Sequence, residues 1–309
     1  MLYEYAVEPQ VLSSWADFRY FADRFGIDHG RLISKYPESW PKLVWEACTE
    51  SSPLNRRRIE EGLNILRNRL LKTKRDYDEK LGWQENAEQA HKSEPFRAII
   101  ASSSSECAET IVAGDLSADS PLWSVQRDGQ VHRQAQAMAE LAESLLVLST
   151  EVYFIDQHFG ATSKHGRPLT AFLASARKGK KLSRIEYHLN GSIDKSLFKA
   201  GLERRRPHLN LAADESIIFI RWNCIEGAQN LHARYLLTNR GGLHFDYGLD
   251  EGDGTTAWAR ISDELLKERR KQFEPESGCF KLADAWKVSC YTVTEVVRKA
   301  GKWVDLPPS

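Results

Sequence analysis

A histidine and an arginine separated by one residue stand out in the stretch LHARYLLTNRGG. The apolar residues around them predict a strand, and side chains along a strand alternate between two faces, so His232 and Arg234 should point the same way. A guanidinium can hold a phosphate group, and an imidazole can exchange protons near neutral pH. The pair therefore indicates chemistry on an anionic substrate. The alternative is a strand histidine that is hydrogen-bonded in a crevice and has no chemical role.

Polar residues also follow the strands predicted upstream of this pair. Loops leave a sheet where its strands end, so side chains at these ends should converge on a crevice and bind substrate there. The candidates are Asp156, His158, His188, Arg221 and Asn223. Asp156 could instead cap a loop, and both histidines could be ordinary surface or packing residues.

The elements that must position these residues alternate between helix and strand after residue 130, which is typical of a layered α/β domain. Apolar periodicity predicts helices at 132–147, 168–179 and 193–205 and strands at 152–155, 182–189 and 216–221. A hairpin is expected over 231–247, with its turn at Arg240-Gly241-Gly242, and a last helix over about 256–273.

In its residues and its order of elements, the region 130–275 resembles one repeat of the phospholipase D-like superfamily. The signature of that family is His-x-Lys, followed after four residues by Asp and then by a glycine-containing segment. On this chain the histidine falls on His232, the lysine on Arg234 and the aspartate on Asn239, with Gly248-Leu249-Asp250 as the later segment. His-x-Arg-Tyr is similar to a divergent branch that includes some membrane-remodelling proteins and small bacterial proteins associated with anti-phage or DNA-modification systems.

The resemblance implies an α/β fold with a layered sheet and flanking helices. It also implies a phosphodiesterase that acts on nucleic acid, a nuclease, in a bacterial defence or DNA-modification setting. His232 would attack phosphorus and form a phosphohistidine, Arg234 would neutralise the developing charge, and Asn239 would donate a hydrogen bond. A second histidine must protonate the leaving oxygen. It would come from another copy in a homodimer, or from His158 or His188. The reaction needs neither a metal nor another cofactor.

Two departures from the signature bear on catalysis. Arginine in place of lysine keeps the positive charge, but Asn239 lacks the carboxylate that would hold an imidazole in one tautomer. The alternative function is therefore a catalytically inactive module that binds nucleic-acid phosphates or scaffolds a partner protein in a defence complex. Binding of lipid headgroups is a third hypothesis. Arg234 could also be a structural ion-pair partner of Asp156 or Glu251.

The rest of the chain is expected to form a helical module at 1–82, a linker with a short strand at 83–129, and an extension at 276–309. The helical expectation depends on aromatic and aliphatic residues recurring at spacings of three and four, such as Trp15, Phe18, Ile59 and Leu63.

Composition limits the classes of protein and of binding site to which this chain can belong. The chain has 309 residues, 41% of them hydrophobic, which is enough for the core of a globular protein. Its 43 basic residues balance 43 acidic ones, so nucleic-acid binding must depend on local patches. Four basic clusters, among them Arg204-Arg205-Arg206, are interpreted as solvated helix faces. Without a secretory signal or a long apolar run, the protein is expected in the cytoplasm with no membrane span. The five scattered cysteines predict reduced thiols rather than a zinc site.

Overall fold

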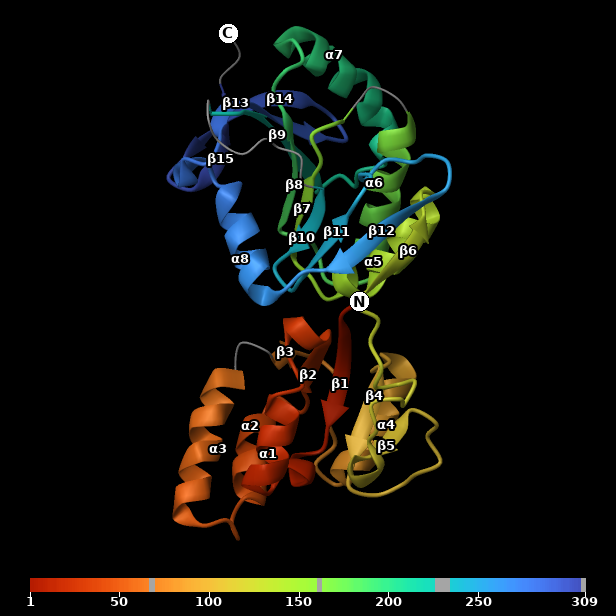
Figure 1. Ribbon diagram of the computed structural model, residues 1–309, viewed down its shortest axis with the longest axis vertical. Coiled ribbons are helices and arrows are strands. Elements are labelled where there is room, and N and C mark those ends of the chain that lie inside the picture. The colour runs from red at the N-terminus through yellow and green to blue at the C-terminus, as the bar shows by residue number, and fades with distance from the viewer. Residues whose placement is uncertain (67–69, 160–162, 226–233, 307–309) are drawn as a thin grey trace. The chain divides into compact units, whose positions relative to one another are not determined.

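The computed structural model of the chain describes residues 1–66, 70–159, 163–225 and 234–306. The chain divides into two compact units, Met1–Gln126 and Arg127–Ser309. Figure 1 shows the first unit in red to yellow and the second in green to blue.

The first unit is built on a five-stranded sheet in the order β3-β2-β1-β4-β5, and every neighbouring pair in it is parallel. Its strands are β1 (Tyr3–Val7), β2 (Arg31–Lys35), β3 (Leu70–Lys72), β4 (Ala98–Ala101) and β5 (Thr110–Val112). Strand order reverses direction at β1, as in doubly wound α/β folds.

Helices cover both faces of this sheet. They are α1 (Trp15–Ala22), α2 (Trp40–Ala47), α3 (Pro53–Leu66) and α4 (Trp83–Ser93). Apolar side chains of α1, α2 and α3 pack with Tyr5 and Val7 on one face. Ala87 and Ala90 of α4 pack with Ala6 and Ile99 on the other. A parallel sheet needs this double cover because its strands are apolar on both sides.

The expectation of a helical module at 1–82 is wrong, because this segment contributes β1, β2 and β3 to the sheet. The short strand expected within 83–129 is present as β4, but this segment also contains α4 and β5 and is not a linker. The strands that were not predicted are buried: Leu32, Ile33 and Ser34 of β2 are buried in succession, so the strand lacks the alternation that marks a half-exposed strand. Runs of three to five such residues do not differ in pattern from part of a buried helix.

The second unit contains a ten-stranded mixed sheet in the order β15-β14-β13-β9-β8-β7-β10-β11-β12-β6. Its three central strands, β7 (Glu151–Ile155), β8 (Arg184–Asn190) and β9 (Ser216–Asn223), are parallel to one another. The outer strands pair antiparallel: β6 (Asp128–His132), β10 (Tyr235–Thr238), β11 (Gly242–Phe245), β12 (Thr255–Arg260), β13 (Lys281–Ser289), β14 (Val293–Lys299) and β15 (Lys302–Asp305).

Helices α5 (Ala135–Val147) and α6 (Ser163–Ala176) lie on one face of this sheet and α8 (Asp263–Gln272) on the other (Figure 1). Helix α7 (Lys195–Arg205) connects β8 to β9, and its first turn is capped by Asp194, which accepts hydrogen bonds from the backbone of Ser196 and Leu197. The hairpin expected around Arg240-Gly241-Gly242 is present as β10 and β11.

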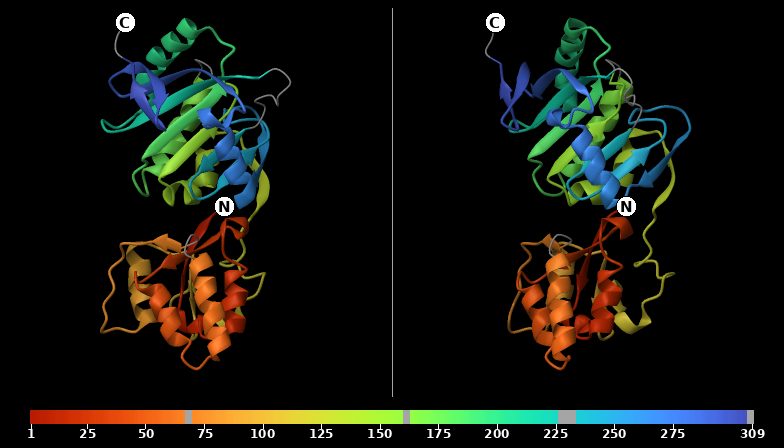
Figure 2. Two further views of the ribbon diagram at one scale, coloured as in Figure 1. Left: turned by 90° about the vertical axis from the view of Figure 1, so that its left-hand side faces the viewer. Right: turned by 60° about the vertical axis from the view of Figure 1, so that its left-hand side comes forward.

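Two expectations for the end of the chain differ from the structure. The segment expected as one helix over 256–273 is a strand, β12, followed by α8, because Ser262 caps the helix at Asp263 and the residues before it alternate in burial as a strand does. Residues 276–309 hold β13, β14 and β15, which continue one edge of the sheet (Figure 2). Among the described residues, no helix combines the length and the apolar character needed to cross a bilayer.

Candidate functional site

The carboxyl ends of β7 and β8 open onto a cavity of about 380 Å³, here called the crevice. Its volume is in the range of small-molecule sites. The charged and imidazole side chains that line it are Arg133, Asp156, His158, Lys164, His165 and Asp250. Sequence analysis identified Asp156 and His158 as candidates here, and the structure brings both to the crevice.

Asp156, directly after β7, holds the loops of the crevice together. Its side chain is 2% exposed, and it accepts hydrogen bonds from the backbone N–H of His158 at 3.0 Å and of Leu249 at 2.8 Å. Burial raises the pKa of the Asp156 carboxyl above its usual value, although these hydrogen bonds and the charge of Arg234 oppose the rise. Asp156 therefore ties β7 to the segment Gly248-Leu249-Asp250.

Gly248 permits this close approach of two backbone segments. Its φ is +125°, and a Cβ atom at this position would lie 2.9 Å from Oδ2 of Asp156 and 3.1 Å from Oδ1 of Asp250. An L side chain would meet both conformational strain and a clash. The glycine-containing segment that the resemblance identified thus lies beside Asp156.

Arg234 lies directly before β10 and opposite Asp156, because β10 pairs antiparallel with β7 and Tyr235 faces Ile155, but it is not among the residues that line the crevice. Its Nη1 donates to the carbonyl of Asp246 at 2.6 Å, and its Nε is buried without a hydrogen-bond partner among the residues that the structure describes. Of the acids proposed as its ion-pair partner, Glu251 pairs with Arg167 instead. Asp156 feels the charge of Arg234, but the hydrogen bonds that its carboxylate accepts come from the backbone of His158 and Leu249.

Asp250 neutralises the arginine and the lysine that line the crevice. Its carboxylate lies 2.8 Å from Arg133 and 3.1 Å from Lys164. Burial acts to raise the pKa of Asp250, but the hydrogen bonds from Lys164 and Arg133 outweigh it, and the pKa is lowered from its usual value. Asp250 is therefore ionised at neutral pH.

Two histidines face the crevice in different environments. His158 is exposed, whereas His165, on the first turns of α6, is 6% exposed. Burial lowers the pKa of His165 to about 4, so its imidazole is neutral at pH 7. Asp250 was placed only in the glycine-containing segment, and no role was predicted for Arg133, Lys164 or His165: Arg133 follows β6 but was expected to lie within a helix, and the other two do not follow a strand. The sequence signal that could have indicated this site is the pair Lys164-His165, which lies just before the helix predicted to begin at Pro168.

His188 does not reach the crevice. It is fully buried on the opposite face of β8, where its Nδ1 accepts a hydrogen bond from Nε1 of Trp222 at 3.1 Å and its Nε2 lies 3.3 Å from Oε2 of Glu186. Glu186 also accepts hydrogen bonds from Arg184 and Trp303. The substrate-binding role expected for His188 is therefore corrected: its position is that of a core residue.

Arg221 and Asn223 end β9 but are not among the residues that line the crevice. The guanidinium of Arg221 is buried, pairs with Asp284 at 3.2 Å and donates to the carbonyls of Gly191 and Asp194. It thereby holds the 191–194 loop, which forms one wall of the crevice. Asn223 is exposed.

Asn239 lies at the other end of the same strands. Its Oδ1 accepts hydrogen bonds from the backbone of Thr150 at 3.0 Å and Glu151 at 3.3 Å, and its Nδ2 donates to the Thr150 hydroxyl. Five residues of extended chain separate it from Arg234, roughly 17 Å. Its expected role as a donor to the phosphate does not fit this position. His232 lies outside the described residues.

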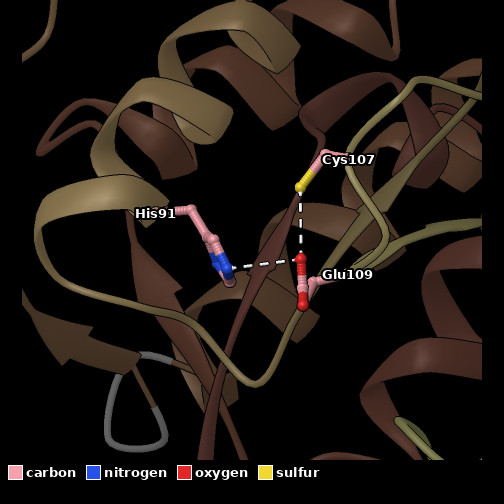
Figure 3. A group of neighbouring side chains, drawn as sticks. All are labelled: His91, Cys107 and Glu109. Atoms are coloured by element: carbon pink, nitrogen blue, oxygen red, sulfur yellow. Dashed lines mark hydrogen bonds and ion pairs between the residues drawn. The ribbon is translucent and has the colours of Figure 1, made fainter.

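A second group of titratable side chains lies in the first unit. His91 and Cys107 both point toward Glu109 (Figure 3). Nε2 of His91 and Sγ of Cys107 are each 3.6 Å from the Glu109 carboxylate, while Nδ1 of His91 accepts the backbone N–H of Phe96 at 3.2 Å. That bond places the imidazole proton on Nε2, the atom that faces Glu109, so the group is arranged for hydrogen bonding rather than for metal coordination.

Comparisons with known proteins do not identify a family for this chain. No family model matches the chain, and no curated protein does. One solved structure, an archaeal chromatin protein named TrmBL2 and described as showing a novel mode of DNA binding, aligns with 51% of this chain at 10% identity and a TM-score of 0.28. The aligned region spans 55% of that protein's chain. A structural similarity this weak says nothing about the fold or the function of this chain. The chain consists of a five-stranded parallel α/β unit and a mixed α/β unit with a ten-stranded sheet.

Proposed function

We propose that the second unit is a phospholipase D-like phosphodiesterase that acts on nucleic acid in a bacterial defence or DNA-modification setting. The observation that supports this most is the position of Arg234 directly before β10 and opposite Asp156, which lines a cavity that can hold a phosphate. Arg234 does not itself line this cavity, but its charge is not paired with Asp250, since Arg133 and Lys164 hold that carboxylate.

In this proposal His232 attacks phosphorus, a phosphohistidine forms, and water hydrolyses it. Arg234 neutralises the charge that develops on the phosphoryl oxygens. The leaving oxygen needs a proton from a group that is protonated at working pH. His165, with a pKa of about 4, is neutral there, so the acid is His158 or the second His232 of a homodimer.

Cleavage by purified protein tests the proposal. The substrates are bis(p-nitrophenyl) phosphate and labelled single-stranded DNA, duplex DNA and RNA, and the variants are His232→Ala and Arg234→Lys. Loss of the nucleophile should reduce turnover by about 10⁴-fold or more. Arg234→Lys keeps the charge but loses the bidentate fork, so it should retain part of the activity. His29→Ala, at an exposed histidine of the first unit, is the matched control.

Equal cleavage by the wild-type protein and His232→Ala would reject the mechanism. No cleavage of any substrate would favour the alternative, a catalytically inactive module that binds nucleic-acid phosphates or scaffolds a partner protein of a defence complex. One observation favours that alternative: Asp250 already neutralises two of the crevice cations, which leaves little positive charge to stabilise a transition state. Salt-sensitive binding of DNA without turnover would support it.

A further inference from the structure

A second cavity of about 610 Å³ lies between α6 and the carboxyl end of α7 and is here called the basic groove. Its polar lining residues are Arg167, Thr170, Arg204, Arg205, His208 and Asn210. None of the described residues that line it is acidic, although the chain as a whole has equal numbers of acidic and basic residues. Arg167 is paired with Glu251, so the positive charge that the groove offers to an anion comes from Arg204 and Arg205.

Arg205 is the unusual member of this group. Its side chain is 6% exposed, its Nη2 is buried without a hydrogen-bond partner, and no described carboxylate lies within ion-pair distance of its guanidinium. Gly166 makes room for it, since a Cβ atom there would lie 2.6 Å from Nη1. The Arg205 guanidinium lies over the Phe159 ring at 5.1 Å from its centroid, but it has no counterion among the described residues. A cation buried in this way is destabilising, and an anionic ligand would offset that effect.

Arg205 also connects the groove to the crevice. It lines a smaller cavity of about 150 Å³ together with Phe159, Ile193, Leu197 and Phe198. Phe159 and Ile193 line the crevice as well. A phosphate-sized crevice, an apolar cavity with an aromatic ring and a basic groove thus follow one another through shared residues.

We propose that the basic groove binds a second phosphate of the strand whose scissile phosphate lies in the crevice, with a base in the apolar cavity between them. This inference rests on the proposed function and makes its substrate a single-stranded oligonucleotide rather than a small diester. Bases bind on aromatic side chains while basic grooves follow the backbone in proteins that hold single strands. A base paired in a duplex could not enter a separate apolar cavity.

The test compares Arg205→Met with the wild-type protein, both in the His232→Ala background so that no substrate is consumed. Fluorescence anisotropy measures binding of labelled ten-residue oligo(dT) and oligo(rU) over a range of salt concentrations. Arg205→Met should weaken binding about tenfold. It should also reduce the slope of log affinity against log salt by about 0.7, the value for one phosphate contact on a single strand. Unchanged affinity and slope for both oligonucleotides would overturn the inference.

Lys199→Met is the matched control, because Lys199 is an exposed cation on the same helix that does not line the groove. It should leave the slope unchanged. A preference for oligo(rU) over oligo(dT) would identify RNA as the substrate, and the reverse would identify DNA.

Cleavage of bis(p-nitrophenyl) phosphate separates this inference from the proposed function. Arg205→Met with His232 intact should lower cleavage of that reporter less than it lowers oligonucleotide binding, because the reporter has no second phosphate for the groove. Reporter cleavage with no effect of Arg205→Met on oligonucleotide binding would reject the groove alone. An effect on binding in a protein that cleaves nothing would reject the phosphodiesterase and keep the groove as a phosphate site.

The thermal midpoint shows whether Arg205 has a structural role instead. Removing an unpaired buried charge should not lower the midpoint. If Arg205→Met lowers the thermal midpoint, Gly166→Ala separates a structural role of Arg205 from a binding role. Alanine favours the helix, but its Cβ atom would displace the Arg205 guanidinium. Weaker binding by Gly166→Ala at an unchanged thermal midpoint supports the inference, and unchanged binding contradicts it.

Discussion

At His165 a single buried imidazole links the stability of the second unit to pH. Its pKa is about 4 in the folded protein and near 6.5 in an unfolded chain. Between these values the unfolded state binds a proton that the folded state does not. The stabilising contribution of the neutral ring is therefore complete above about pH 6.5 and is lost as the pH falls toward 4.

We expect the urea midpoint of the wild-type protein to fall between pH 7 and pH 4.5, and the fall to be smaller in His165→Asn. Urea unfolding followed by circular dichroism at several pH values measures this. His158→Asn, at the exposed histidine of the same crevice, should keep the wild-type pH dependence. A parallel pH profile for wild type and His165→Asn would mean that the buried ring does not control acid sensitivity.

The sequence predicts the position of some candidate residues at the crevice but not of others. Asp156 and His158 could be placed at the crevice because they directly follow a strand. His188 could not be excluded, because β8 is buried over Ile185–Leu189 and an apolar strand of this kind gives no sign of which face each side chain occupies. Only the contacts of the folded chain, with Trp222 and Glu186, show that it faces away.

Among the secondary structure elements, the pairing of β10 with β7 decides the roles of two residues of the family signature. Antiparallel register puts Arg234 opposite Asp156 and Asn239 at the far end of the strand, where Asn239 accepts hydrogen bonds from two backbone N–H groups. A linear motif of eight residues spans both ends of a strand, so its members need not share one site.

Asn239→Ala should therefore lower the free energy of unfolding by about 1–3 kcal/mol, because the N–H groups of Thr150 and Glu151 lose their acceptor. Asn239→Asp keeps an acceptor and should lower it less. Both variants should retain nucleic-acid binding, measured by anisotropy, once the protein is folded. A loss of binding at unchanged stability would instead place Asn239 at the substrate.

Helices were predictable where one face is apolar, and strands were predictable where turn or polar residues bound an apolar run. The amphipathic α5 and the strand, hairpin and helix units of the second sheet follow from periodicity and turn residues. Strands β1, β2 and β3 could not be predicted in the same way, since they are short and lie between helices whose aromatic residues dominate the local pattern.

For the whole molecule, the division at residue 126 separates two hydrophobic cores. The core of the first unit joins residues from Tyr5 to Trp123, and both of its helical layers lie within the same 126 residues. The crevice and the basic groove are lined entirely by residues of the second unit. Each unit therefore has the contacts that a folding domain needs.

We expect fragments 1–126 and 127–309 each to unfold cooperatively on heating, as measured by circular dichroism. The second fragment should bind oligo(dT) with the affinity and salt dependence of the full chain. An unfolded or non-binding fragment 127–309 would show that the first unit contributes to the stability or the substrate contacts of the second.

One contact in the second unit has a consequence for synthesis on the ribosome. Glu186 lies in the middle of the sheet, and one of its hydrogen-bond donors, Trp303, follows it by 117 residues. The nascent chain thus displays a carboxylate-bearing central strand long before β15 emerges to cover it, whereas the first unit is already complete. A ribosome that stalled between these two points would hold a sheet in which the Glu186 carboxylate still lacks its hydrogen bond from Trp303.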